Sequence, residues 1–135
     1  LMERMNVLFG TPFEEMIGFS RAVRVGPFVS VGGTAPLAAD GSTVGIGDVA
    51  AQTQRCFEIV EDALARAGAS LSDVVRTRLL MVDVEEFEQA AVVRKRFVGH
   101  VKPVDTIVQV ARFVNPEWLI EVEVDAIVAD DGVRS

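Results

Sequence analysis

A strict alternation of side-chain types near the C-terminal end constrains the fold more than any other feature of this chain. Between positions 118 and 127, one alternate set of residues is wholly apolar, and the other carries three carboxylates. Successive side chains of a β-strand point to opposite faces, so this segment predicts a strand with one face under helices and one mixed, charged and apolar face. The apolar set is Trp118, Ile120, Val122, Val124 and Ala126, and the mixed set is Leu119, Glu121, Glu123, Asp125 and Ile127.

Turn and cap signals divide the rest of the chain. Gly26-Pro27 separates two β-rich runs and predicts a hairpin. Asp48 is placed to cap a helix with apolar residues at 3.6-residue spacing, and Asp83 precedes a second helix at the spacing of a capping box with Glu86. The order ββαβαββ favours an α+β fold with two helices on one face of the sheet. The predicted strands are 19–25, 28–32, 74–82, 106–111 and 119–128, and the predicted helices are 49–67 and 84–98.

Composition narrows the class of protein. A length of 135 residues with 50% hydrophobic content predicts one domain, 1–135, with a core at about 18–129. The net charge of −7 repels phosphate backbones, which disfavours nucleic-acid binding and a ribonuclease. The single Cys56, on the buried stripe of the first helix, fits a packing residue in a reducing cytoplasm. No apolar run reaches the roughly 20 residues that span a bilayer, so we expect no membrane association.

The chain holds one histidine and no tyrosine, so acid–base chemistry would depend mainly on carboxylates or bound water. His100 follows Gly99 and is expected at the surface near a helix C-terminus; a catalytic role is the alternative. The three carboxylates of the mixed face have three readings: ion pairs with Arg76, Arg78 or Arg112, a ligand-cleft role for Glu121, or a metal site. The mixed face itself suits a subunit interface.

Several blocks, in order, carry a resemblance to a known family. They are Phe19–Gly26, Val31–Gly33, Gln52-Thr53, Ala67–Thr77 and Val108–Arg112. With these blocks the chain resembles the Rid family (YjgF/RidA, endoribonuclease L-PSP-like). The resemblance implies a chorismate mutase-like fold and a homotrimer whose sheets close into a central barrel. It also implies a small-molecule ligand in a cleft between subunits and hydrolysis of enamine or imine intermediates to 2-oxoacids and ammonia. We expect no cofactor, and no metal because no second cluster of ligands is evident in the sequence.

The resemblance also assigns cleft residues. Glu121 matches the glutamate thought to hold the attacking water, so it is the implied catalytic residue. Catalytic members read Pro-Ala-Arg-Ser where this chain reads Pro103-Val104-Asp105-Thr106, so their substrate-binding arginine falls on Asp105. The implied substrate-binding residues are Phe19 (tyrosine in the family), Gly32 and Gly33 (usually Ser-Gly), Phe87 (near an aromatic position), Asp105 and Ile107 (often cysteine).

Asp105 leaves the activity open. A guanidinium would make two parallel hydrogen bonds to a substrate carboxylate, whereas a carboxylate repels it, so canonical 2-imino acids should not bind in the usual pose. Asp105 could instead serve as an acid or base, receive a cationic or hydroxylated ligand, cap the start of the following strand, or pair with an arginine. Two functions follow: a deaminase or hydrolase acting on another enamine or imine, or a non-catalytic ligand-binding or regulatory trimer.

Overall fold

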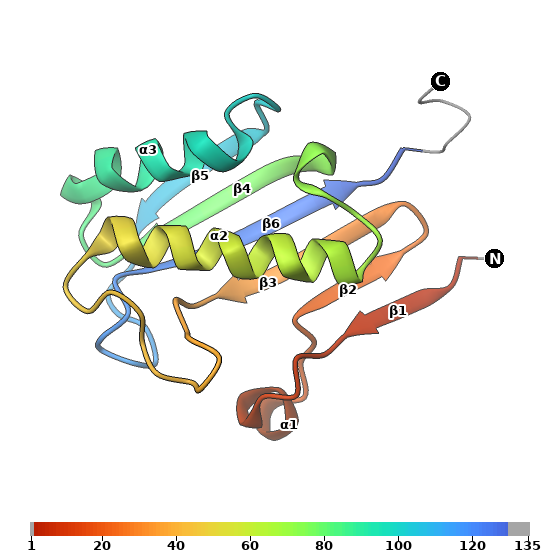
Figure 1. Cartoon of the computed structure of the whole chain (residues 1–135), viewed down its shortest axis with the longest axis horizontal. Helices are drawn as coiled ribbons and strands as arrows, with labels where there is room; N and C mark the ends of the chain where they lie inside the picture. The colour runs from red at the N-terminus through yellow and green to blue at the C-terminus, as the bar shows by residue number, and fades with distance from the viewer. Residues whose placement is uncertain (1, 130–135) are drawn as a thin grey trace.

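The computed structural model describes residues 2–129; positions 1 and 130–135 of the predicted domain lie outside this range. One six-stranded sheet carries the two long helices on a single face (Figure 1), which confirms the predicted α+β architecture. The strands are β1 (Arg4–Val7), β2 (Ala22–Val25), β3 (Phe28–Thr34), β4 (Val74–Met81), β5 (Val104–Gln109) and β6 (Ile120–Ile127). The helices are α1 (Pro12–Ile17), α2 (Val49–Arg66) and α3 (Phe87–Val98), with 3-10 turns at Leu71–Asp73 and Val84–Glu86.

The sheet order is β1-β2-β3-β6-β4-β5, which puts the C-terminal strand β6 in the interior of the sheet. β6 runs antiparallel to both of its neighbours, β3 and β4. β5 runs parallel to β4, because α3 crosses over the sheet between them and returns the chain in the same direction. The last two strands of the sequence are therefore not neighbours, since β4 lies between them.

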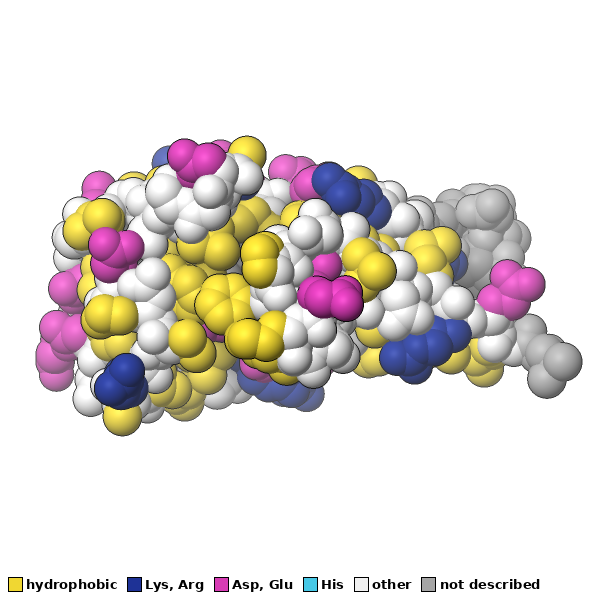
Figure 2. All heavy atoms as spheres, turned by 90° about the horizontal axis from the view of Figure 1, so that it is seen from below, with side chains coloured by type: hydrophobic (Ala, Val, Ile, Leu, Met, Phe, Trp, Pro, Cys, Tyr) yellow, Lys and Arg dark blue, Asp and Glu magenta, His cyan; other side chains and the backbone are white. Residues whose placement is uncertain are grey.

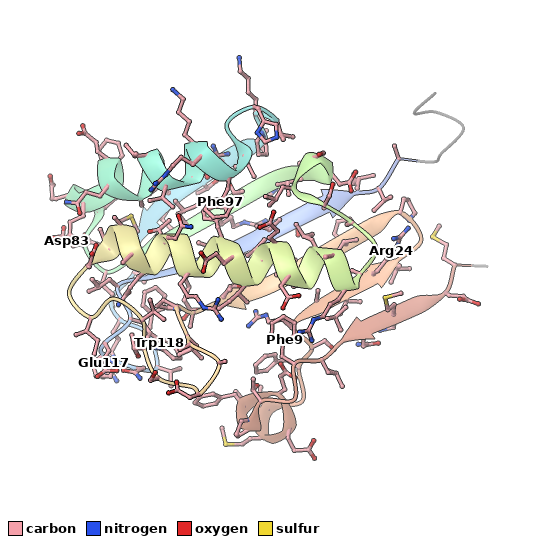
Figure 3. The ribbon with its side chains drawn as sticks, viewed as in Figure 1. Phe9, Arg24, Asp83, Phe97, Glu117 and Trp118 are labelled. Carbon is pink, nitrogen blue, oxygen red and sulfur yellow. The ribbon has the colours of Figure 1, made fainter. Side chains whose placement is uncertain are left out.

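The apolar set of the alternating segment packs under the helices, as predicted. Trp118 is 8% exposed, and the other four members are at most 1% exposed. The helices meet this face with Phe57 of α2, whose ring stacks on Phe97 of α3 at a centroid distance of 5.2 Å. Phe97 is labelled in Figure 3. Leu79 and Met81 of β4 join the same cluster. One core therefore fills the space between the sheet and the two helices.

Both predicted helices are present, but only α2 begins where the sequence predicts. Asp48 caps α2, because its carboxylate accepts a hydrogen bond from the Ala51 amide at 3.1 Å. Asp83 accepts from the Glu85 amide at 3.0 Å, but the turn that it caps is 3-10, and α3 begins only at Phe87. Within residues 2–129, no helix is both long and apolar enough to cross a membrane.

Two N-terminal elements were not predicted. β1 pairs with β2 and extends the sheet by one strand beyond the predicted core at 18–129. α1 has ordinary boundary signals: Thr11 accepts from the Glu14 amide, Pro12 occupies the first turn, and Gly18 ends the helix with φ of 84°. The predicted strand at 19–25 begins only at Ala22, because the chain leaves α1 through Phe19 and Ser20.

Two neighbouring valines of α3 provide a test of this packing. Val93 is 1% exposed and Val92 is 62% exposed. We expect Val93→Ala to lower the free energy of unfolding by about 2 kcal/mol, because it removes buried methyl groups and leaves a cavity. Val92→Ala should change it by less than about 0.5 kcal/mol. Urea denaturation measures both; equal losses would contradict the assignment of the buried face of α3.

Candidate functional site

A bulge in β3 forms the centre of the candidate site. Val31 pairs with Val124 and Thr34 pairs with Val122, so β3 takes one more residue than β6 between the same two pairs. Gly32 and Gly33 fill this bulge, and both are exposed. The irregular backbone is tied down by the Thr34 hydroxyl, which donates to the Gly32 carbonyl at 2.7 Å.

Glu121 of β6 lies directly against this bulge. A Cβ atom on Gly33 would be 2.7 Å from Glu121 Oε1, so only glycine permits the observed approach. The side chain lies on the sheet face away from the helices and is partly buried. Burial raises the pKa of the Glu121 carboxyl, nearby Arg21 opposes this rise, and Glu123 adds to it. A carboxylate with a raised pKa is better suited to accept a proton near neutral pH.

Arg21 is the site residue that the sequence analysis missed. Its guanidinium Nη2 donates to the Gly33 carbonyl at 2.6 Å, and its own carbonyl accepts from the Gly32 amide at 3.2 Å. Burial lowers the pKa of Arg21, while Glu14 and Glu121 act in the opposite direction. The signal in the sequence was an arginine two residues after the predicted cleft residue Phe19. The sequence analysis includes Arg21 only within the family block Phe19–Gly26 and gives it no separate role.

Phe19 lines a hollow beside α1 at the edge of the molecule. The hollow has a volume of about 150 Å³ and includes Glu14, which is 6% exposed and accepts hydrogen bonds from the Phe9 and Gly10 amides at 3.0 Å. Figure 2 shows this edge from below, with hydrophobic side chains gathered across its middle. The lining residues are Leu8, Gly10, Thr11, Glu14, Glu15 and Phe19.

The remaining predicted substrate-binding residues lie elsewhere in the same chain. Asp105 of β5 accepts a hydrogen bond from the Thr77 hydroxyl at 2.7 Å and pairs with Arg94 Nε of α3 at 3.3 Å. It therefore points toward the helices, and Ile107 likewise packs against the core. Phe87 is 45% exposed at the start of α3. β4 separates β5 from β6, so these residues do not join Glu121 and the glycine pair within one subunit.

The other carboxylates of β6 are engaged in ion pairs. Glu123 lies 3.4 Å from Arg78, and Asp125 lies 3.9 Å from Arg76 and 3.8 Å from Arg78. Among the residues described, Glu121 has no such pair within 4.0 Å. Across residues 2–129, no group of three His, Cys, Asp or Glu side chains is arranged to hold a metal ion. Glu121 is therefore the carboxylate of this strand that is available for chemistry.

Neither remaining candidate nucleophile or base adds to the site. Cys56 is fully buried, with its sulfur 3.9 Å from the Ile120 carbonyl, and burial raises the pKa of the thiol. Because the thiolate is the reactive form, this residue is inert packing, as predicted. His100 is exposed just after α3, which confirms its predicted surface position.

The Asp105–Arg94 pair gives a testable consequence. The Arg94 and Asp105 side chains are 14% and 26% exposed, so Asp105→Arg would leave two guanidinium groups facing each other with little water. We expect a loss of about 2–3 kcal/mol in the free energy of unfolding, partly recovered by the double exchange Asp105→Arg with Arg94→Asp. Asp62→Arg, which opposes Arg66 in a half-exposed pair, is the matched control and should cost less than about 1 kcal/mol. Equal losses in urea denaturation would contradict a structural role for Asp105.

Known proteins share both the pattern and the fold. The endoribonuclease L-PSP family profile matches residues 11–128. A Mycobacterium tuberculosis member of the YjgF/YER057c/UK114 family has a crystal structure with a TM-score of 0.84 and 40% identity, covering 93% of this chain and 100% of that one. A RutC family protein of Pyrococcus abyssi is 34% identical, covering 87% of this chain and 93% of that protein. The 3-aminoacrylate deaminase RutC of Acinetobacter baylyi is 31% identical, covering 84% and 88%. The chain therefore belongs to the endoribonuclease L-PSP (YjgF/RutC) family, which confirms the resemblance to the YjgF/RidA family.

Proposed function

We propose that this protein is a small-molecule deaminase that hydrolyses an enamine or imine, with Glu121 as the general base. The observation that carries the proposal is the partly buried Glu121 carboxylate, which is held against Gly33 and has no ion-pair partner within 4.0 Å in the described chain. The similarity of the chain to a 3-aminoacrylate deaminase supports the same class of reaction. The proposed cleft also includes Phe19 and Gly32, and receives Phe87, Asp105 and Ile107 from the adjacent subunit.

The reaction requires one base and one water molecule. Glu121 accepts a proton from water as the water oxygen bonds to the imine carbon, and the C=N electron pair moves to nitrogen, which receives the proton back from Glu121. In the resulting carbinolamine, Glu121 transfers the hydroxyl proton to the amino nitrogen as the C=O bond forms and the C–N bond breaks, so that nitrogen leaves as ammonia. The products are a carbonyl compound and ammonia. An enamine follows the same reaction steps after protonation of its β-carbon converts it to the imine.

The canonical 2-imino acid is not the proposed substrate. In relatives with the Pro-Ala-Arg-Ser pattern, the arginine would bind the substrate carboxylate. Here Asp105 occupies that position, and its carboxylate is directed at Arg94. The cleft thus loses the bidentate contact expected from β5, and the ligand must be held by other groups.

A ligand-binding protein without turnover is the second candidate. It is favoured by the replacement of two hydroxyl groups of the family cleft, since Phe19 and Gly32 stand where tyrosine and serine are usual. A site that has lost these donors can retain a ligand and still fail to activate it. The two candidates differ in whether ammonia is released.

We propose a homotrimer, since the face of the sheet without helices is poorly suited to solvent. It combines the ion pairs of Arg76 and Arg78 with exposed apolar residues, among them Phe28 (45% exposed) and Ile127 (50% exposed). A face of this kind is buried more favourably against another copy of the chain. Cytoplasmic localisation remains part of the proposal.

The trimer is tested by light scattering with size-exclusion chromatography. We expect a mass of three times the 14.6 kDa chain at micromolar concentration. The reason is that the mixed sheet face loses exposed apolar area in the assembly while its charges stay paired. A stable monomer would contradict both the trimer and a cleft between subunits.

Glu121→Gln tests the chemistry. We expect at least a hundredfold loss of ammonia release from 3-aminoacrylate-type enamines, because the amide cannot accept the proton of water. Folding raises the pKa of Glu121, so its ionised form weakens the fold as pH rises through the folded pKa. The variant should therefore melt no lower than the original protein at pH 7.

The control is Glu123→Gln, on the same strand and face but paired with Arg78. It should keep activity and lose only a little stability. Full activity in Glu121→Gln would assign Glu121 to structure. Absence of ammonia release from 3-aminoacrylate would favour the binding protein.

A further inference from the structure

The Arg21 guanidinium is a partly buried cation that donates few of its hydrogen bonds to the protein. Among the residues described, it donates one hydrogen bond, to the Gly33 carbonyl. Its Nε–H is buried without a partner. A guanidinium carries five N–H donors, and a buried donor without an acceptor is costly. The fold therefore holds a cation with unused donors beside the bulge.

No carboxylate of the described chain neutralises Arg21 directly. Glu14 and Glu121 act on it through space, but neither forms an ion pair within 4.0 Å. The Glu14 oxygens are already occupied by the amides of Phe9 and Gly10. The positive charge at this place is thus available to an external anion.

The glycine pair leaves the guanidinium accessible. A Cβ atom at Gly32 would lie 3.2 Å from Arg21 Nη2, and one at Gly33 would meet Glu121. Because neither glycine has a side chain, the bulge covers neither Arg21 Nη2 nor Glu121 Oε1. Arg21 is also anchored through the Gly33 carbonyl, so less side-chain entropy is lost when it binds a ligand.

We infer that Arg21 supplies the anion contact of this cleft, so that the ligand is a small carboxylic acid whose carboxylate binds Arg21 and whose reacting carbon lies beside Glu121. This inference rests on the proposed function for the identity of the cleft. It assigns to Arg21 the charge that Asp105 cannot provide. A planar guanidinium suits the two oxygens of a carboxylate.

The test is a binding titration that does not require turnover. Pyruvate and its uncharged amide, pyruvamide, are titrated into the full protein and followed by NMR chemical shifts. The original protein should bind pyruvate and bind pyruvamide at least tenfold more weakly. Arg21→Gln, which removes the charge and keeps an amide donor for Gly33, should weaken pyruvate binding at least tenfold. Arg21→Lys should keep part of the affinity.

The control is Arg24→Gln. Arg24 of β2 also donates hydrogen bonds to backbone carbonyls, those of Gly26 and Ala67 at 2.9 Å. Its side chain lies beside the C-terminal end of α2 (Figure 3). Its loss should leave pyruvate binding unchanged. If Arg21→Gln fails to fold, Gly32→Val provides the second test, because it keeps the charge and places a side chain against Arg21 Nη2. It should also abolish pyruvate binding.

Pyruvate binding that survives both Arg21→Gln and Gly32→Val, or that equals pyruvamide binding, would overturn the inference. So would the absence of pyruvate binding to the original protein. Failure of the proposed deaminase reaction is distinguishable, since Glu121→Gln removes turnover but should preserve or strengthen pyruvate binding. Arg21-dependent binding without ammonia release would support the inference and not the reaction.

Discussion

Strand β6 pairs along both edges, so its alternating side chains determine what each face of the sheet contacts. Ile120, Val122 and Val124 turn to the helices and are almost completely buried. Glu121, between two of them, must then point to the opposite face. Because the neighbouring strand β3 contains the Gly32–Gly33 bulge, that carboxylate lies against backbone and not against a side chain. Core packing and the position of the candidate base thus depend on the same short segment.

The parts of the fold that follow from local patterns were predictable from the sequence. The alternation in β6 and the Asp48 cap depend on residues close together in the chain, and both appear as expected. β1 was missed because four residues, three of them exposed, carry little hydrophobic pattern. The position of β5 at the sheet edge depends on pairing with β4 across the α3 crossover, which no local pattern encodes.

The candidate site was only partly predictable for a related reason. The resemblance identified Glu121 and the glycine pair, and the structure places them together. The direction of the Asp105 side chain depends on the pairing of Asp105 with Thr77 in the sheet. It also depends on Arg94 of α3, which contacts both residues. Arg21 was missed because its role depends on the irregular course of β3, which brings the Gly33 carbonyl within reach of its guanidinium. Contacts of this kind arise from tertiary structure, so the spacing of Arg21 two residues after Phe19 does not reveal its partner.

Charge in this protein is distributed differently from the pattern that the resemblance implies. β5 carries a carboxylate where a guanidinium is expected, and this carboxylate neutralises Arg94 beneath the sheet edge. Arg21, which has no ion pair within 4.0 Å among the residues described, instead lies near Glu121, and its attraction opposes the rise in the pKa of that carboxyl. An anion bound to Arg21 would cancel much of this attraction and add its own repulsion of the ionised carboxylate. Both effects raise the pKa of Glu121 further, so the base would be stronger in the complex than in the free protein. Ligand binding and proton transfer would then be coupled through the two charges that flank Gly33.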